Sequence, residues 1–467
     1  MARPPGDQLD GGRRLPPAAQ RAGAPSQPDR RHHLVPRHGA RQGRGRGPGR
    51  GDARPPSGEP ARRDDRAGRG RRGPAAARGG GVTPGALDGL RVVELGEFIS
   101  APYAGRLLAG LGADVVKVEP PEGDRARRHG PFLRDEPHPE RSGLFLLLNA
   151  GKRGVVLDLE AAAGRERLGR LLESADCLVE SLEIEALERW GLTAEETRRR
   201  WPRLVHVSIT TFGRSGPCSR FRGQGLQASA AGAASITIGA PGRPPLPLPA
   251  SQPDYQGGVN GAIGALLALF ARRRNGQGQH VDVATADVVA FYGGITSVMY
   301  TAHGLPWARE GHRAAKSGGY YPYTILPCKD GYICMITRSG HPWKKFVEAM
   351  GSPEWSRDPR YQDRARIGRE YPDEMDALLA PWLRERRAGE ILAVCRQAGI
   401  PFSVVRDADD VAACPQLASR DFFVEIHHPA AGRLSYPGAP WKLSATPWRL
   451  LRPAPLLGEH TEEVFAA

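Results

Sequence analysis

Short runs of β-branched residues alternate with stretches of helical spacing from residue 85 onward. Residues 91–95 (RVVEL) and 113–119 (ADVVKVE) have the composition of buried strands, and residues 102–112 between them carry apolar residues at helical spacing. Gly112 closes the helical stretch, as glycine often does. This order of strand, helix and strand predicts a βαβ unit with parallel strands and a right-handed crossover.

The same alternation continues to residue 213. It predicts strands at 154–159, 176–181 and 204–213, and helices at 161–175 and 185–201. The fold class that follows is α/β, with a doubly wound, Rossmann-like large domain. The loop after residues 91–95 lacks the G-x-G-x-x-G pattern, so the usual dinucleotide fingerprint is missing.

Further along the chain, residues 255–273 form a predicted helix rich in small residues, followed by a strand at 280–284. Gly258, Gly261 and Gly264 leave one face of that helix nearly bare, which favours close packing against another backbone. The later predictions are a hairpin turning at Lys329-Asp330-Gly331, helices at 343–351 and 378–399, and a strand at 400–407.

These patterns predict four parts of the chain. Residues 1–83 form a tail, 84–300 the large domain, 301–424 a smaller α+β domain, and 425–467 a return to the large domain in short strands and turns.

The charge of the chain is concentrated at its start. Of the formal net charge of +15, residues 1–81 hold +12, since they contain 19 Arg, no Lys and 7 Asp or Glu. Only +3 is left for residues 82–467, and this near-neutral balance argues against a nucleic-acid partner for the folded part.

The Arg/Gly/Pro-rich tail has almost no aliphatic or aromatic residues, so it cannot bury enough apolar surface to fold, and we expect it to be disordered. Three explanations for it stay open. It is an RGG-like RNA-binding arm, an unstructured tail, or an upstream stretch of a GC-rich gene that precedes a true start near Val82.

Signals for export and membranes are missing from the sequence. The N-terminus has no apolar core of a secretory signal, and no run of about 18 apolar residues occurs, so we expect no membrane span. The six cysteines form no C-x-x-C pair and have no histidines at zinc spacing. We therefore expect reduced thiols, no metal site and a cytoplasmic location.

Asp254 immediately precedes the glycine- and alanine-rich helix. An aspartate there can simply cap the helix, which is a common structural role. It can also act as a nucleophile, because covalent catalysis divides one difficult transfer into easier steps. We expect the positive end of the helix dipole to hold its carboxylate in the ionised form.

Four stretches resemble the family III CoA-transferases, the group that includes the formyl-CoA and carnitine CoA-transferases. They occur in the family's order, and they are residues 87–124 (LDGLRVVEL…EGD), 149–159 (NAGKRGVVLDL), 254–283 and 454–464 (APLLGEHTEEV). The similarity extends from about residue 86 to the C-terminus, so only the Arg-rich tail lies outside it.

This resemblance implies that Asp254 is the nucleophile. In the family, an aspartate at this position attacks an acyl-CoA and becomes an aspartyl-CoA thioester, from which an incoming carboxylic acid takes the CoA. The resemblance also implies that coenzyme A thioesters are substrates, that no cofactor is bound, and that two chains form an interlocked homodimer.

Other family positions suggest contacts with CoA. The candidates for CoA binding are Ser100, Ala101, Leu157, Asp158, Leu159, Glu160, Ser181, Leu182 and Arg189. The alternative for each is an ordinary strand end or a solvated helix face. Pro120 stands where some members carry a CoA-binding arginine, and the candidates to replace that arginine are Arg125, Arg127 and Arg128.

Gly318, Gly319 and Tyr320 resemble the glycine loop that shields the covalent intermediate in the formyl-CoA branch of the family. This chain has fewer consecutive glycines there, and a plain turn explains two glycines equally well.

Two alternative functions follow from the same sequence. The α-methylacyl-CoA racemases of this family pair the aspartate with a histidine about thirty residues earlier, but no histidine occurs here between His206 and His280. Proton transfer on both faces of the α-carbon needs that partner, so racemase chemistry is disfavoured. The other alternative is an RNA-binding protein that acts through the Arg/Gly tail.

Overall fold

The computed structural model describes residues 84–304, 308–313, 320–337 and 340–466. The chain divides into two units, Met1–Arg78 and Gly79–Ala467. The first unit, the rest of the predicted tail to residue 83, and the predicted loop residues Gly318 and Gly319 lie outside the described residues.

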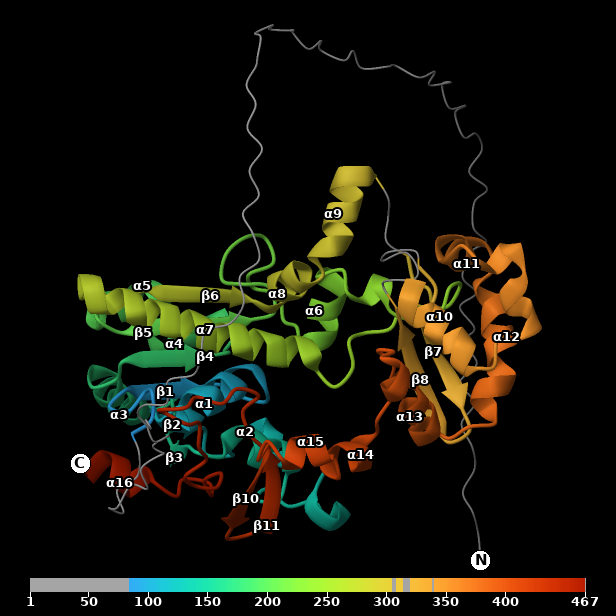
Figure 1. The fold of residues 1–467 in the computed structure, drawn as a ribbon. Helices are drawn as coiled ribbons and strands as arrows, with labels where there is room; N and C mark the ends of the chain where they lie inside the picture. Colours follow the sequence, from blue (N-terminus) through green and yellow to red (C-terminus); the bar gives the residue numbers. More distant parts are fainter. Residues whose placement is uncertain (1–83, 305–307, 314–319, 338–339, 467) are drawn as a thin grey trace, which may run out of the picture. The chain divides into compact units, whose positions relative to one another are not determined.

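A six-stranded parallel sheet forms the centre of the second unit (Figure 1). Its strands are β1 (Arg91–Leu95), β2 (Asp114–Glu119), β3 (Arg153–Val156), β4 (Cys177–Glu180), β5 (Val205–Thr210) and β6 (His280–Ala284). They lie in the order β3-β2-β1-β4-β5-β6. The predicted α/β class and parallel sheet are confirmed, and the order is that of a doubly wound fold.

Helices cover both faces of this sheet. On one face lie α1 (Ser100–Gly110) and α7 (Gln252–Asn275), which pack on Val92 and Val207. On the other face, α3 (Ala162–Glu173), α4 (Ile184–Trp190) and the C-terminal α16 (Thr461–Ala466) pack on Val93 and Leu178. Because successive strand residues point to opposite faces, neighbours such as Val92 and Val93 belong to different cores.

The bare face of α7 brings it close to its neighbours, as the glycine pattern predicts. A Cβ on Gly258 would lie 2.6 Å from the carbonyl oxygen of Ser100 in α1, and one on Gly261 would lie 2.3 Å from Cδ1 of Ile209 in β5. Side chains at these positions would push α7 away from the sheet, so glycine permits the observed contact.

Two predicted helices are wrong, because each is interrupted in the structure. The predicted helix at 378–399 is divided between α12 (Pro372–Arg384) and α13 (Ala388–Ala398), and the second begins where Glu390 accepts the backbone N–H of Arg387 at 2.7 Å. Residues 185–201 form two helices, α4 and α5 (Ala194–Arg200), because Gly191 takes a left-handed conformation that ends the first. Thr193 and Glu196 then form a capping box that starts the second.

The remaining elements of the sheet region are short. They are η1 (Arg125–Arg128), η2 (Leu133–Asp135), α2 (Gly143–Asn149), α6 (Gly225–Ala231), η3 (Ser235–Thr237), α8 (Thr285–Tyr292) and α9 (Gly294–His303). Figure 1 shows α9 projecting from α8.

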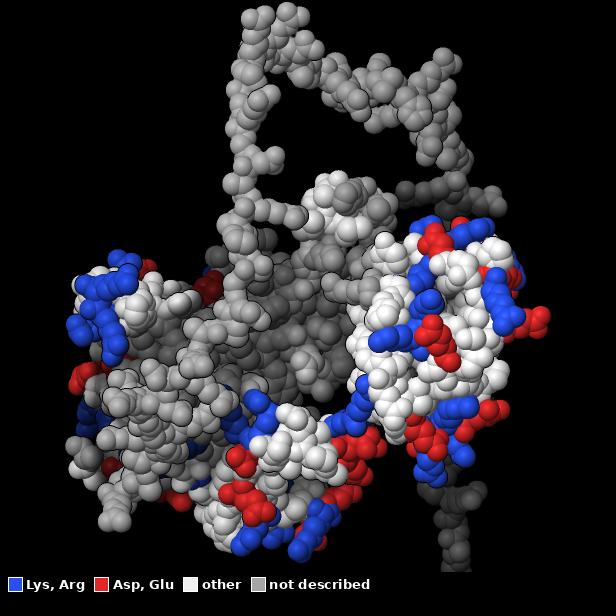
Figure 2. All heavy atoms as spheres, in the orientation of Figure 1, with Lys and Arg blue, Asp and Glu red and all other residues white. Residues whose placement is uncertain are grey.

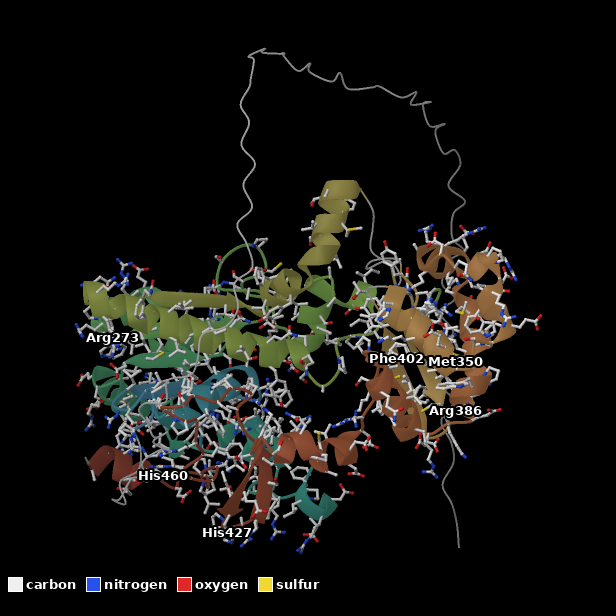
Figure 3. All side chains as sticks on the ribbon, viewed as in Figure 1. Arg273, Met350, Arg386, Phe402, His427 and His460 are labelled. Carbon is white, nitrogen blue, oxygen red and sulfur yellow. The ribbon has the colours of Figure 1, made fainter. Side chains whose placement is uncertain are left out.

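A second sheet has its own core. The predicted hairpin is confirmed as β7 (Tyr323–Cys328) and β8 (Gly331–Ile336), joined by a two-residue turn, and β9 (Ser403–Val404) is much shorter than the predicted strand at 400–407. The helical elements here are α10 (Gly340–Ala349), η5 (Glu354–Arg357), η6 (Pro359–Tyr361), α11 (Arg364–Glu370), α12 (Pro372–Arg384) and α13 (Ala388–Ala398). Phe402 and Met350 belong to this core (Figure 3).

The C-terminal part passes through α14 (Ala408–Ala412), α15 (Pro415–Ala418) and the antiparallel pair β10 (Phe423–His428) and β11 (Gly432–Pro437). It ends against β3, where the backbone N–H of His460 donates to the carbonyl of Gly154 at 2.9 Å. The predicted domain boundaries at residues 301 and 425 stay a prediction.

Charges of both signs are interspersed on the face drawn in Figure 2, notably over α10–α12 and around β10–β11. One group of basic side chains is visible near the C-terminal end of α7, where Arg273 lies (Figures 2 and 3). The other basic side chains on that face lie among acidic ones, which agrees with the near-neutral charge of residues 82–467. No helix of the described ranges is both long and apolar enough to cross a bilayer.

Candidate active site

A cleft of about 870 Å³ opens at the carboxyl ends of the parallel strands. Its walls come from the loops after β1, β4, β5 and β6, together with Arg125 and the starts of α6 and α7. The loops after β1 and β4 meet here, where the strand order reverses, and open α/β sheets bind their ligands at such switch points.

Asp254 lies in this cleft, in the first turn of α7. Its Oδ2 accepts a hydrogen bond of 3.1 Å from the backbone N–H of Gly225, the first residue of α6. The alternative that Asp254 caps its own helix is wrong, because no side-chain hydrogen bond caps α7. Gly225 also has to be small, since a Cβ there would lie 2.5 Å from the same Oδ2.

Burial raises the pKa of Asp254 from 3.8 to about 6, although the Gly225 N–H and the charge of Arg125 act to lower it. Burial thus outweighs the two lowering contributions. At neutral pH the carboxylate is still mostly ionised, and its raised basicity makes it a better nucleophile than an exposed aspartate.

Three non-glycine residues near Asp254 have positive φ angles. Phe98 in the β1–α1 loop (φ 70°) and the residues before α7, Ala250 (φ 50°) and Ser251 (φ 52°), adopt left-handed conformations without being glycine. Such conformations cost on the order of 1–3 kcal/mol each, and they persist where the surrounding structure enforces them. Phe98 and Ser251 both line the cleft.

A buried ion network supports the β1–α1 wall. Asp124 accepts the N–H of Phe98 at 3.1 Å and pairs with Lys117 at 2.9 Å, and both side chains are fully buried. Lys117 also pairs with Glu94, whose other oxygen lies 2.6 Å from Nζ of Lys152. Removing any member would leave a buried charge uncompensated, so the network holds the loop firmly.

The stretch 149–159 contributes to this network rather than to the cleft. Nζ of Lys152 donates to Oδ1 of Asn149 at 2.8 Å, and burial lowers the pKa of Lys152 to about 8 even though Glu94 raises it. Arg153 pairs with Asp114 at 2.5 Å. These residues of the family-like stretch therefore connect strands.

A second buried pair joins the opposite walls. Arg214, in the loop after β5, contacts Oε2 of the fully buried Glu180 at 2.6 Å and the carbonyl of Leu182 at 2.8 Å. Its backbone N–H donates to Asp282 of β6 at 2.8 Å. The loops after β4 and β5 are thus tied together through one guanidinium.

The predicted CoA-binding residues separate into two groups. Ser100, Ser181 and Leu182 line the cleft, and so does Arg125, one of the three candidates to replace the missing arginine. Arg127 instead pairs with Glu119 at 2.7 Å and is buried, while Arg128 donates to the carbonyl of Glu122.

The other predicted contacts lie outside the lining of the cleft. Ala101, Leu157 and Leu159 are buried in the core. Asp158, Glu160 and Arg189 are exposed, and Glu160 pairs with Arg189 at 3.0 Å. Tyr320 is exposed, whereas its neighbours Gly318 and Gly319 fall outside the described residues. Contact of these residues with CoA or an intermediate stays a prediction.

Several residues of the site escaped the sequence analysis. Arg214, Arg220 and Gly225 all line the cleft; the two arginines lie in the segment 211–224 between β5 and α6, and Gly225 is the first residue of α6. The glycines and arginines of this part of the chain were the only sequence feature that could have indicated a site. The contact itself was not predictable from local sequence, because Gly225 and Asp254 lie 29 positions apart in the chain. Among the described residues, no histidine lines the cleft.

The fold and the cleft define a doubly wound α/β protein that presents a half-buried carboxylate at its switch point, a class suited to covalent chemistry on a large ligand. Residues 87–461 match the model of CoA-transferase family III. The chain belongs to this family, as the four sequence stretches suggested.

Curated relatives cover most of the chain. It is 35% identical over 387 residues to the succinyl-CoA:(R)-benzylsuccinate CoA-transferase subunit BbsE of Thauera aromatica, which covers 80% of this chain and 92% of the relative. It is 30% identical to a succinate–glutarate CoA-transferase of Agrobacterium fabrum (81% and 95% covered) and 32% identical to a formyl-CoA:oxalate CoA-transferase of Streptomyces coelicolor (82% and 95%).

A solved structure shares the fold. A CAIB/BAIF family protein from Brucella suis superposes with a TM-score of 0.75 at 29% identity, covering 82% of this chain and 99% of the other. Family membership and these relatives support CoA transfer as the activity, with CoA thioesters as substrates.

Proposed function

We propose that this protein moves CoA from an acyl-CoA to a free carboxylic acid through an aspartyl-CoA thioester on Asp254. The observation that carries the proposal is the placement of Asp254, whose carboxylate faces a large cleft at the switch point of the sheet and accepts a backbone N–H. The named CoA-transferases among its relatives support the reaction type.

The reaction needs only carboxylates and a thioester. An oxygen of Asp254 attacks the thioester carbonyl, the C–S bond breaks, and CoA leaves as a thiolate with an acyl-aspartyl anhydride behind it. The thiolate then attacks Cγ of Asp254 and releases the first acid. A second carboxylate attacks the aspartyl-CoA, and the same steps in reverse give the new acyl-CoA and restore Asp254.

The Gly225 N–H has a defined part in these steps. It donates to Oδ2 of Asp254, so it is placed to stabilise the negative charge that grows on that oxygen when Cγ is attacked. A backbone donor needs no reorganisation during the reaction, and the tight fit of Gly225 against the carboxylate keeps it in position.

The cleft accommodates the substrate. Its volume of about 870 Å³ falls within the usual range for pockets that enclose sizeable ligands. We propose that Ser100, Ser181 and Leu182 contact the CoA arm along it. The relatives' names include succinate, glutarate and oxalate, so a dicarboxylic acid is the first candidate for one of the two substrates.

Intact-mass measurement tests this proposal. The purified protein is incubated with a panel of acyl-CoAs and no acceptor, and an adduct with the mass of CoA is expected for the wild type and not for Asp254→Ala. Asp409→Ala, an exposed carboxylate on α14, is the matched control and keeps the adduct. Absence of any adduct, together with deuterium uptake at the α-carbon of a 2-methylacyl-CoA, would favour proton-transfer chemistry instead.

We also propose a homodimer. Ile263, Leu267 and Phe270 follow one another on the outer face of α7 and are exposed, and Phe291 on α8 is 82% exposed. Clustered exposed apolar side chains of this kind suit an interface with a second copy of the chain. Light scattering is expected to show a dimer, and Leu267→Glu should shift it toward the monomer; a monomeric wild type would refute the assignment.

A cytoplasmic location is the companion proposal. All six cysteines are free, which suits a reducing compartment. Fractionation of the source cells, with CoA-transferase activity followed through the fractions, tests it.

A further inference from the structure

Arg125 occupies a particular place in the cleft. It is the first residue of η1, and the side chain of Asp124 caps this short helix by accepting the N–H of Ala126 at 2.7 Å. Because the same Asp124 also holds Phe98, the backbone that carries Arg125 is fixed to the β1–α1 wall. The guanidinium therefore projects from a rigid base into the space that Asp254 also faces.

Four arginines line the cleft among the described residues, and they differ in how closely they are neutralised. Three form short ion pairs, which are Arg214–Glu180 at 2.6 Å, Arg220–Glu188 at 2.5 Å and Arg222–Glu183 at 2.5 Å. Arg125 lies 3.7 Å from Glu97, the longest of the four pairs, and its side chain is 48% exposed. Its donors are thus the least committed of the set.

The charge of Arg125 acts where the reaction would take place. It lowers the pKa of Asp254 against the effect of burial, which means that the guanidinium lies within electrostatic reach of the nucleophile. Its partner Glu97 has a raised pKa, caused first by burial and then by Asp124. The contact of Glu97 with Arg125 is also the loosest of the four, at 3.7 Å, so it leaves guanidinium donors available for a ligand.

We propose that Arg125 binds a second carboxylate at the far end of the acyl group, so that the protein uses monothioesters of dicarboxylic acids. This inference rests on the proposed CoA transfer and names the substrate class for that site. The thioester carbon must come within about 3–3.5 Å of the attacking oxygen. The acyl chain then extends from Asp254 into the cleft, and the planar guanidinium offers paired donors that match a carboxylate.

Two acyl-CoA substrates of equal chain length distinguish binding of the distal carboxylate from binding of the CoA moiety. Succinyl-CoA and butyryl-CoA have four-carbon acyl groups that differ in ending with a carboxylate or a methyl group. The rate of CoA-adduct formation is measured for each by rapid quenching and intact mass, without an acceptor. The wild type is expected to prefer succinyl-CoA. Arg125→Gln is expected to lower the succinyl-to-butyryl ratio of the second-order rate constants for adduct formation by about 10–100-fold, as for the loss of a charged hydrogen bond.

Two further variants sharpen the result. Arg125→Lys keeps the charge without the paired donors and is expected to retain an intermediate ratio. Arg170→Gln removes an exposed arginine of α3, whose partner is Glu166, and should leave the ratio at the wild-type value.

The outcomes are distinguishable. An equal loss with both donors would overturn the inference, because Arg125 would then act on the CoA moiety or on Asp254 itself, and CoA transfer would still stand. A wild type that forms the adduct from butyryl-CoA as fast as from succinyl-CoA would also overturn it. Failure to form an adduct with every acyl-CoA tested would remove the proposed function and this inference together.

Discussion

Replacing Asp254 with asparagine is expected to stabilise the protein while abolishing CoA-adduct formation. Burial holds the pKa of Asp254 at about 6 in the folded protein, against 3.8 for the ordinary group. The folded state thus binds this proton more tightly than the unfolded state, so ionisation of Asp254 lowers the unfolding free energy as pH rises from about 4 to 6. Asparagine has nearly the same shape, can accept the Gly225 N–H, and never ionises.

The expected gain follows from this difference. At about 1.36 kcal/mol per pKa unit, the variant should be more stable by about 3 kcal/mol at pH 8 and by about 1.6 kcal/mol at pH 5. For a folded unit of this size, the gain at pH 8 corresponds to roughly 4 °C in Tm.

Thermal and urea unfolding at the two pH values measure the effect, and Asp409→Asn serves as the control because Asp409 is exposed on α14. The reasoning is refuted if Asp254→Asn is no more stable than the wild type at pH 8, or if its gain is the same at pH 5 and pH 8. Either result would mean that the cleft does not penalise the charged form of Asp254.

Three further predictions concern the site and its supports. Adduct formation should fall about tenfold from pH 7 to pH 5, because a nucleophile with a pKa of about 6 loses its ionised form over that range, and a flat pH profile would contradict this. Gly258→Ala should cost about 1–3 kcal/mol in urea unfolding, since the new Cβ would lie 2.6 Å from the carbonyl of Ser100, whereas Gly389→Ala on α13 has open space and should be neutral or stabilising; similar effects of the two would count against close packing. Glu180→Gln should cost about 3–5 kcal/mol because it leaves Arg214 buried without its partner charge, and a change within 0.5 kcal/mol would show that the pair contributes little.

The pattern of hydrophobic residues was sufficient to predict short strands that are buried in the sheet. The strands at 91–95 and 280–284 have the predicted bounds, since both runs are rich in valine and too short for a helix. The break at Gly191 was missed because periodicity continues on both sides of it, and only the left-handed backbone shows where the helix ends. The strand predicted at 400–407 pairs with β8 over only two residues, Ser403 and Val404. The length of this pairing depends on β8, which the sequence of 400–407 does not reveal.

The candidate site was predictable only in part. Asp254 followed from the resemblance, and its helix from the small residues behind it. The contact with Gly225 and the net direction of the pKa shift depend on burial and on a loop 29 positions away, which no local pattern encodes. Likewise, Arg125 and Arg127 are equivalent in sequence, yet Arg127 is buried against Glu119 while Arg125 faces the cleft.

Helix α7 connects the proposed nucleophile to the outer surface of the protein. Its first turn carries Asp254, its glycine face rests directly on α1 and β5, and its outer face exposes Ile263, Leu267 and Phe270. Because glycines let this helix pack directly on its neighbours, it has little room to tilt. We expect a partner bound to its outer face to shift the whole helix, including the first turn that carries Asp254. Dimer formation and catalysis would then depend on the same helix. Dilution should therefore lower the specific activity at the protein concentration at which the dimer dissociates.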